Sequence, residues 1–186
     1  MKLSVFLFFI LALSPLQEFD VFQKHGNHAA VTHITIPPSM FNMLSKFKVN
    51  TNDPETESLL LMIKSLQTFR VMTTKDATIA KDMAQWLATE IEQTDLTSLF
   101  NVKKDGVRVK FGAVFSPQQD KVKRLVMWVE GLDEFVAKNP EINLNSPADL
   151  DYILLEIKGD LALDQISALT SIVNIPGGEY LDILDR

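Results

Sequence analysis

Residues 99–115 have the sequence LFNVKKDGVRVKFGAVF, and this stretch decides the expected fold. Two runs rich in apolar side chains flank Asp105-Gly106, a dipeptide typical of tight β-hairpin turns. In the second run apolar side chains occupy every second position from Val107 to Phe111, so Arg108 and Lys110 point to the opposite face. The stretch therefore predicts a β-hairpin with one apolar face.

Further strand patterns follow the hairpin. After a turn at Ser116-Pro117, the sequence pattern of residues 122–129 predicts a third strand of the meander, with Trp128 as a core residue. The nearly continuous apolar run from Tyr152 to Ile157 predicts a central strand, which we expect to end at Gly159. Residues 132–146 leave the structure open, because Phe135-Val136 could extend a strand whereas Asn139-Pro140 must interrupt it.

Helical patterns dominate the first half of the chain, with two strand patterns among them. The longest helix is expected from Lys75 to Gln93, and Trp86 lies on its apolar face, as a core residue would. Residues 31–36 and 69–73 alternate as strands do, and a last helix is expected to start at Asp164. This order predicts an α+β single domain with a largely antiparallel or mixed β-sheet and helices packed mainly on one face.

The N-terminus has the features of a secretory signal peptide. Lys2 is followed by an apolar run that ends at Leu13, which is shorter than the roughly 20 residues that a membrane-spanning helix needs. Ser14-Pro15 then interrupts the helix. We therefore expect a signal peptide at residues 1–16, one domain at residues 17–186, no transmembrane helix, and export to the periplasm or the cell envelope.

The composition excludes several classes of protein. The 186 residues are 46% hydrophobic and 23% charged, as in ordinary globular domains. The chain has no cysteine, which excludes thiolate metal sites and a lipoprotein anchored through cysteine. A net charge of −6 makes nucleic acid an unlikely partner for the surface as a whole.

Three segments together resemble a known family. They are the strand–proline–helix element at residues 34–41, the leucine-rich segment at residues 59–66, and LLEIKGDLALDQIS at residues 154–167. They resemble a Bacteroidetes-type family of small exported proteins catalogued as a domain of unknown function, many of which look like envelope lipoproteins. The resemblance implies export and this fold, and it implies no activity, cofactor or catalytic residue.

No catalytic motif or cofactor-binding motif occurs in the sequence. His25, His28 and His33 are the candidate metal ligands, because three imidazoles within nine residues are a possible zinc or copper set. Gly26-Asn27 breaks any helix that would align His25 with His28, and no Asp or Glu lies between Asp20 and Asp53, which favours solvated histidines and predicts no bound metal.

Basic residues gather in the predicted meander of this acidic chain. They predict a docking surface for an anionic envelope component, such as a lipid head group or polysaccharide, or for another envelope protein. The competing interpretation is that lysines on exposed strands prevent edge-to-edge pairing. The seven residues are Lys103, Lys104, Arg108, Lys110, Lys121, Lys123 and Arg124.

The sequence favours a non-catalytic accessory or binding protein of the bacterial envelope over an enzyme. The alternative is a small periplasmic hydrolase or metal-dependent enzyme whose site is assembled from residues distant in the sequence. A Met-rich segment, Met40, Met43 and Met62, suits either an adaptable groove or ordinary core packing.

Overall fold

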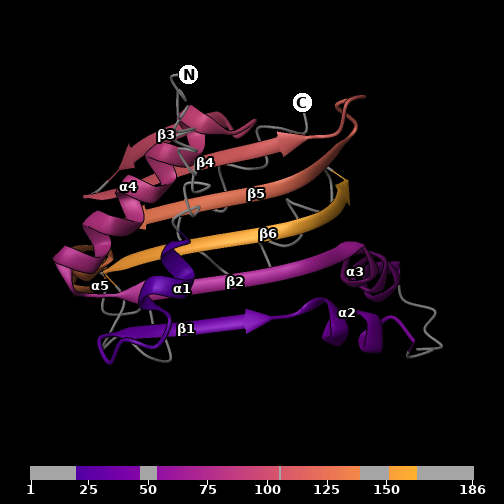
Figure 1. Ribbon diagram of the computed structural model, residues 1–186, viewed down its shortest axis with the longest axis horizontal. Helices are drawn as coiled ribbons and strands as arrows, with labels where there is room; N and C mark the ends of the chain where they lie inside the picture. Colours follow the sequence, from indigo (N-terminus) through magenta and orange to yellow (C-terminus); the bar gives the residue numbers. More distant parts are fainter. Residues whose placement is uncertain (1–19, 47–53, 105, 139–150, 163–186) are drawn as a thin grey trace, which may run out of the picture.

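Six strands form one antiparallel sheet in the order β1-β2-β6-β5-β4-β3 (Figure 1). The computed structural model describes residues 20–46, 54–104, 106–138 and 151–162. The expected α+β fold and the antiparallel sheet are confirmed. In chain order the elements are α1 (Val21–His25), β1 (Val31–Ile36), α2 (Pro38–Leu44), α3 (Pro54–Ser65), β2 (Leu66–Thr74), α4 (Ala77–Gln93), β3 (Thr97–Lys104), β4 (Val107–Phe115), β5 (Lys121–Glu130), α5 (Leu132–Lys138) and β6 (Tyr152–Ala162).

The hairpin expected from residues 99–115 is formed by β3 and β4. Lys104 pairs with Val107 across the turn, and Phe100 pairs with Phe111 further along the strands. Gly106 in the turn has φ +92°, a left-handed conformation that glycine adopts without steric cost. The turn therefore forms because the sequence places a glycine where the backbone requires one.

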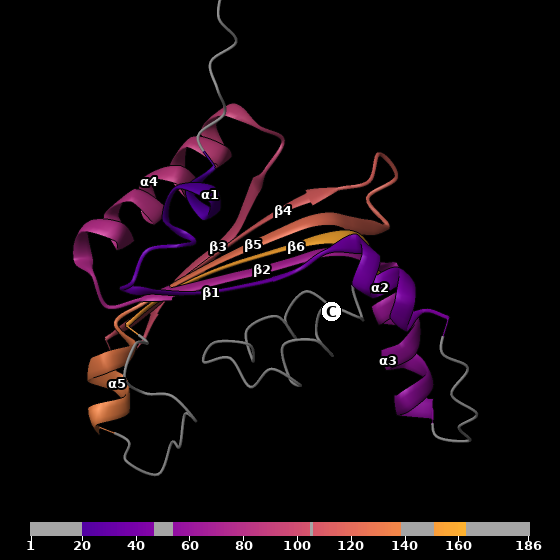
Figure 2. The same cartoon turned by 60° about the horizontal axis from the view of Figure 1, so that its bottom comes forward.

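One face of the sheet is covered by α4 and α1, and we call it the helix face (Figure 2). Asp76 caps α4 by accepting hydrogen bonds from the backbone N–H groups of Thr78 and Ile79. Trp86 of α4 and Trp128 of β5 are both buried there, as expected. The buried apolar side chains of this layer are Val21, Phe22, Met72, Ile79, Ala80, Met83, Trp86, Leu87, Leu96, Val126, Trp128 and Leu154.

The opposite face of the sheet forms a second apolar layer. Of the described helices, α2 and α3 lie beyond one end of this face and α5 beyond the other (Figure 2). The expected placement of helices over one face therefore holds for α1 and α4, whereas the other three helices lie on the second side. The buried apolar side chains of this layer are Phe41, Met62, Leu66, Val107, Val109, Phe111, Ala113, Val122, Leu125, Met127, Val129, Leu132, Leu155, Ile157 and Leu161.

Two expectations about individual elements need correction or completion. β6 lies inside the sheet between β2 and β5, as expected, but it continues past Gly159 to Ala162. The segment at residues 132–146, where the sequence suggested a strand extension, begins instead as a helix, α5. The expected signal peptide at residues 1–16 and the last helix from Asp164 lie outside the described residues.

Gly159 is a glycine because another part of the backbone lies against it. A Cβ atom at this position would be 2.4 Å from the carbonyl oxygen of Ser65, where α3 ends and β2 begins. Glycine inside a strand is typical of such close approaches of two backbones. The residue therefore shapes the junction between α3 and the sheet and does not end β6.

Gly159→Ala is expected to lower the free energy of unfolding by about 1–3 kcal/mol, because main-chain atoms have to move to admit the methyl group. Gly112→Ala in β4 is the control. The three atoms nearest to its Cβ would all belong to the Leu96 side chain, at 3.0–3.3 Å, and a side chain yields more easily than backbone. Urea unfolding of both variants measures the difference, and an equal effect of the two substitutions would contradict the close approach at Gly159.

Candidate functional site

Five charged side chains cross the helix face of the sheet in an alternating row, which we call the charge ladder. Three of them come from neighbouring strands: Arg70 of β2, Glu156 of β6 and Arg124 of β5. The two outer acids come from the cap of α1 and from α4. In spatial order the members are Asp20, Arg70, Glu156, Arg124 and Glu90.

Glu156 is the centre of the ladder and its side chain is 0% exposed. Arg70 is its register partner on β2 and donates from Nε to Oε2 at 2.7 Å. Arg124, diagonally placed on β5, donates from Nε to Oε1 at 2.8 Å. Both carboxylate oxygens are thus occupied by guanidinium donors. A carboxylate held in this way is a fixed structural anion and has little capacity to act as a general base.

The two arginines attach the helices to the sheet. Arg70 donates from Nη1 to Asp20 Oδ2 at 2.7 Å and lies 4.1 Å from the centre of the Phe22 ring in α1. Arg124 donates to Glu90 of α4 and lies 5.6 Å from the centre of the Trp86 ring. Each guanidinium therefore combines two ion pairs with a cation–π contact. The ladder holds α1 and α4 at fixed positions on the strands.

The charges of the ladder are balanced locally. Burial acts to lower the pKa of Arg70, but the hydrogen bond to Asp20 and the charge of Glu156 outweigh it, so that pKa lies above its ordinary value. Lys158 adds a positive charge 3.5 Å from Glu156 Oε1. In the described part of the chain, no buried side-chain nitrogen or oxygen lacks a hydrogen-bond partner. The network is therefore fully satisfied, as a buried polar network has to be.

The sequence interpretation missed most of the ladder, although a signal was present. Glu156 interrupts the apolar run Tyr152 to Ile157, and Arg70 stands inside a predicted strand between Phe69 and Val71. A charged residue in a strand that is buried on both faces needs an opposite charge beside it. That rule identifies Glu156 and Arg70 as members of a buried pair, but it does not tell which residues complete the network.

The structure gives each of the three histidines its own partner. His25 Nε2 lies 2.9 Å from Asp82 Oδ2, which also accepts from Lys24 at 2.7 Å. These two bonds lower the pKa of Asp82 below its ordinary value. His28 accepts from the Ala30 N–H group, and the Nε2 atom of His33 lies 2.8 Å from the hydroxyl oxygen of Thr35. Within the described ranges, no three His, Asp or Glu side chains gather closely enough to hold a metal ion.

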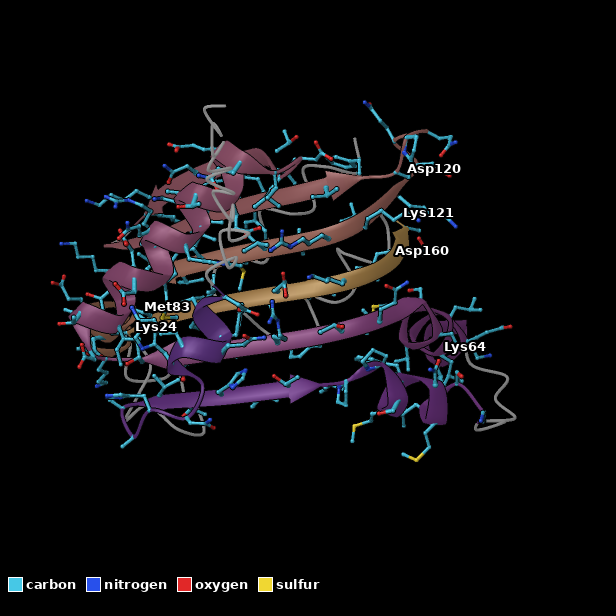
Figure 3. The ribbon with its side chains drawn as sticks, viewed as in Figure 1. Lys24, Lys64, Met83, Asp120, Lys121 and Asp160 are labelled. Carbon is cyan, nitrogen blue, oxygen red and sulfur yellow. The ribbon has the colours of Figure 1, made fainter. Side chains whose placement is uncertain are left out.

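The seven basic residues do not form one surface. Lys103, Lys104 and Arg108 lie at the β3–β4 turn, whereas Lys121 and Lys123 lie towards the opposite end of the sheet. Figure 3 shows Lys121 beside Asp120 and Asp160 at that end. Lys110 lies inside β4, opposite Trp128, and Arg124 is a member of the charge ladder. The expected clustering fails because successive turns of a meander lie at alternate ends of the sheet.

Three of the seven cations are already paired with carboxylates. Arg108 binds Glu130, Lys123 binds Asp160, and Arg124 belongs to the charge ladder. The hydrogen bond from Lys123 also lowers the pKa of Asp160. Lys103 and Lys104 end the edge strand β3, where exposed lysines oppose pairing with other chains. Docking of an anionic partner at the seven residues stays a prediction.

Four large apolar side chains are exposed on β1 and on the two helices that follow it in the chain. Met62 is buried, but Met40 and Met43 of α2 are 44% and 52% exposed. Ile34 of β1 and Leu61 of α3 are 51% and 54% exposed. We call these four residues, Ile34, Met40, Met43 and Leu61, the apolar margin. They are the large hydrophobic side chains that the described part of the chain leaves exposed, and they belong to three consecutive elements.

The fold and the charge ladder define a class: an α+β domain whose helices are fixed to an antiparallel sheet by buried ion pairs. The chain belongs to the family described as domain of unknown function (DUF4252), whose model matches residues 22–169. The expected resemblance to a family catalogued as a domain of unknown function is thereby confirmed. No curated protein and no solved structure is significantly similar to the chain. Among the described residues, no helix combines the length and apolar character needed to cross a membrane.

Proposed function

We propose that this chain is an exported, non-catalytic binding or accessory protein of the bacterial envelope. The observation that carries the proposal is the apolar margin. Scattered apolar residues are normal on protein surfaces, but a group of them on neighbouring elements is typical of an interaction surface. Methionine strengthens this interpretation, because its flexible, polarizable side chain adapts to the shape of a partner.

The charged residues of the helix face support a binding protein over an enzyme. A general base needs a lone pair that can reach a substrate proton. Glu156 is fully buried and both of its carboxylate oxygens accept hydrogen bonds from arginine. The ladder therefore has the organisation of a structural network that keeps the domain rigid while another surface makes contacts.

Export is supported by the sequence of residues 1–16, a basic start followed by a short apolar run. An exported chain without a cysteine needs protein or lipid contacts to stay at the envelope. The apolar margin is a surface that supplies such contacts. Export and envelope contact are thus parts of one proposal.

Cell fractionation combined with intact-mass measurement tests export. We expect the native protein in the periplasmic or envelope fraction, with an N-terminus between about Ser14 and Glu18. Recovery of the chain in the cytoplasm with Met1 intact would contradict the proposal.

A pair of variants tests the margin. Met43→Lys combined with Leu61→Lys places two cations in the apolar margin, at side chains exposed enough to leave the fold intact. We expect this double variant to be released from washed envelopes, whereas Gln85→Lys on the exposed side of α4 stays bound like the wild type. Equal retention of all three proteins would contradict binding through the margin.

A further inference from the structure

The two edges of the sheet differ in how they are protected against pairing with another chain. At the β3 edge the register shifts between Ser98 and Phe100, and the strand ends in Lys103 and Lys104. A bulge bends an edge strand, and lysines make its pairing with a neighbouring strand unfavourable. The β3 edge therefore has two of the devices that natural sheets use to stay monomeric.

The β1 edge has neither device. Its sequence, VTHITI at residues 31–36, contains no Asp, Glu, Lys or Arg. Its six residues pair with β2 without a register shift, from Val31 opposite Thr74 to Ile36 opposite Phe69. Ile34 points away from the helix face and is 51% exposed. A regular, uncharged edge strand with an exposed isoleucine is a template for strand addition.

We propose that β1 pairs antiparallel with β1 of a second copy of this chain, joining two sheets into one across a two-fold axis. Directly opposed residues in an antiparallel pair share a face of the sheet. Pairing Ile34 with the partner's Ile34 meets this condition and places Thr32 opposite the partner's Ile36. The two exposed isoleucines then cover each other.

Charge and length both fit a second copy. The chain carries a net charge of −6, so two copies repel each other over most of their surfaces. The strand β1 contains no Asp, Glu, Lys or Arg, so pairing it with an identical strand brings no two formal charges together at neutral pH. Pro37 and Pro38 follow β1 directly and limit the pairing. Because the same limit applies to both copies, the two strands match in length. Each α2 then follows immediately after the shared strand, which places Met40 and Met43 beside the new interface.

The mass of the exported, untagged chain tests the pairing, measured by light scattering over a range of concentrations. We expect the mass to rise towards that of two chains for the wild type. Ile34→Lys should raise the dissociation constant at least about tenfold, because it sets two like charges opposite each other. Ser98→Lys, the same change at an exposed position on the β3 edge, should behave as the wild type does. Circular dichroism confirms that both variants are folded.

A single introduced thiol tests the register. The chain has no cysteine, so Ile34→Cys provides one thiol per copy, and opposed strand positions lie within reach of a disulfide. We expect Ile34→Cys to form a covalent dimer under mild oxidation much faster than Ser98→Cys. A wild type that keeps the mass of one chain at every concentration, dimers that persist in Ile34→Lys, or equal cross-linking of the two cysteine variants would each overturn the proposal. Envelope retention is tested with Met43→Lys and Leu61→Lys, which lie outside β1, so the two proposals can fail independently.

Discussion

Leu154→Asp and Leu155→Asp are each expected to unfold the protein. The two residues are neighbours on β6, so their side chains point to opposite faces of the sheet, and they are 0% and 2% exposed. Leu154 packs in the layer under α1 and α4, whereas Leu155 packs in the second apolar layer. An unpaired buried carboxylate costs several kcal/mol, a large part of the roughly 5–15 kcal/mol that stabilises a typical domain.

Far-ultraviolet circular dichroism and a thermal melt measure the outcome. Ser98→Asp on the exposed edge strand β3 is the control, and it should melt close to the wild type. The two leucine variants test the two faces separately. If one of them melted at the wild-type temperature, the face to which that leucine points would not be a packed layer.

Glu156→Leu is expected to lower the free energy of unfolding by about 3–5 kcal/mol, because it leaves two largely buried arginines without their shared carboxylate. For a chain of this size, that loss corresponds to a melting temperature lower by about 6–20 °C. Glu156→Gln keeps the size of the side chain and one acceptor oxygen, so a smaller decrease is expected. Chemical unfolding of the three proteins separates the contribution of the charge from that of the shape.

Asp160→Asn is the matched control for the ladder. Asp160 lies four residues further along β6 and binds Lys123, but both of these side chains are 46% exposed. Exposed ion pairs contribute little to stability because water screens them. The melting temperature of Asp160→Asn should therefore stay near that of the wild type. If Glu156→Leu and Asp160→Asn lowered the melting temperature equally, the buried ion pairs of the ladder would contribute no more to stability than an exposed pair does.

The ladder also explains how α1, a helix of only five residues, is fixed to the sheet. α1 is too short to be stable by itself. Val21 and Phe22 bury their side chains on the sheet, and Asp20 both caps the helix and binds Arg70. Loss of Arg70 would thus remove both the ion pair to Asp20 and the cation–π contact to Phe22, and would leave α1 with its cap alone. The position of Asp20 and α1 therefore depends on Arg70 in the sheet.

Much of the fold could be predicted because its signals are local. Asp105-Gly106 between two apolar runs specifies a hairpin within a few residues, and Asp76 caps α4 through its own neighbours. The run of apolar side chains that begins at Tyr152 predicts an interior strand, because such a run requires burial on both faces. The sequence does not explain Gly159, because the carbonyl group of Ser65 that requires a glycine there is distant in the sequence.

By itself the sequence determined the α+β class, the meander, the buried tryptophans and the family resemblance, since each of these rests on short-range patterns. Only the tertiary structure decided which charges meet. Arg70 and Glu156 are 86 positions apart and Arg70 and Asp20 are 50 apart, so their pairing follows from strand order and helix placement. The same strand order carried the basic residues of the meander to opposite ends of the sheet and left β1 at an edge. Strand order is a property of the whole chain, because it is set by the joint burial of both faces of the sheet, and no single segment contains it.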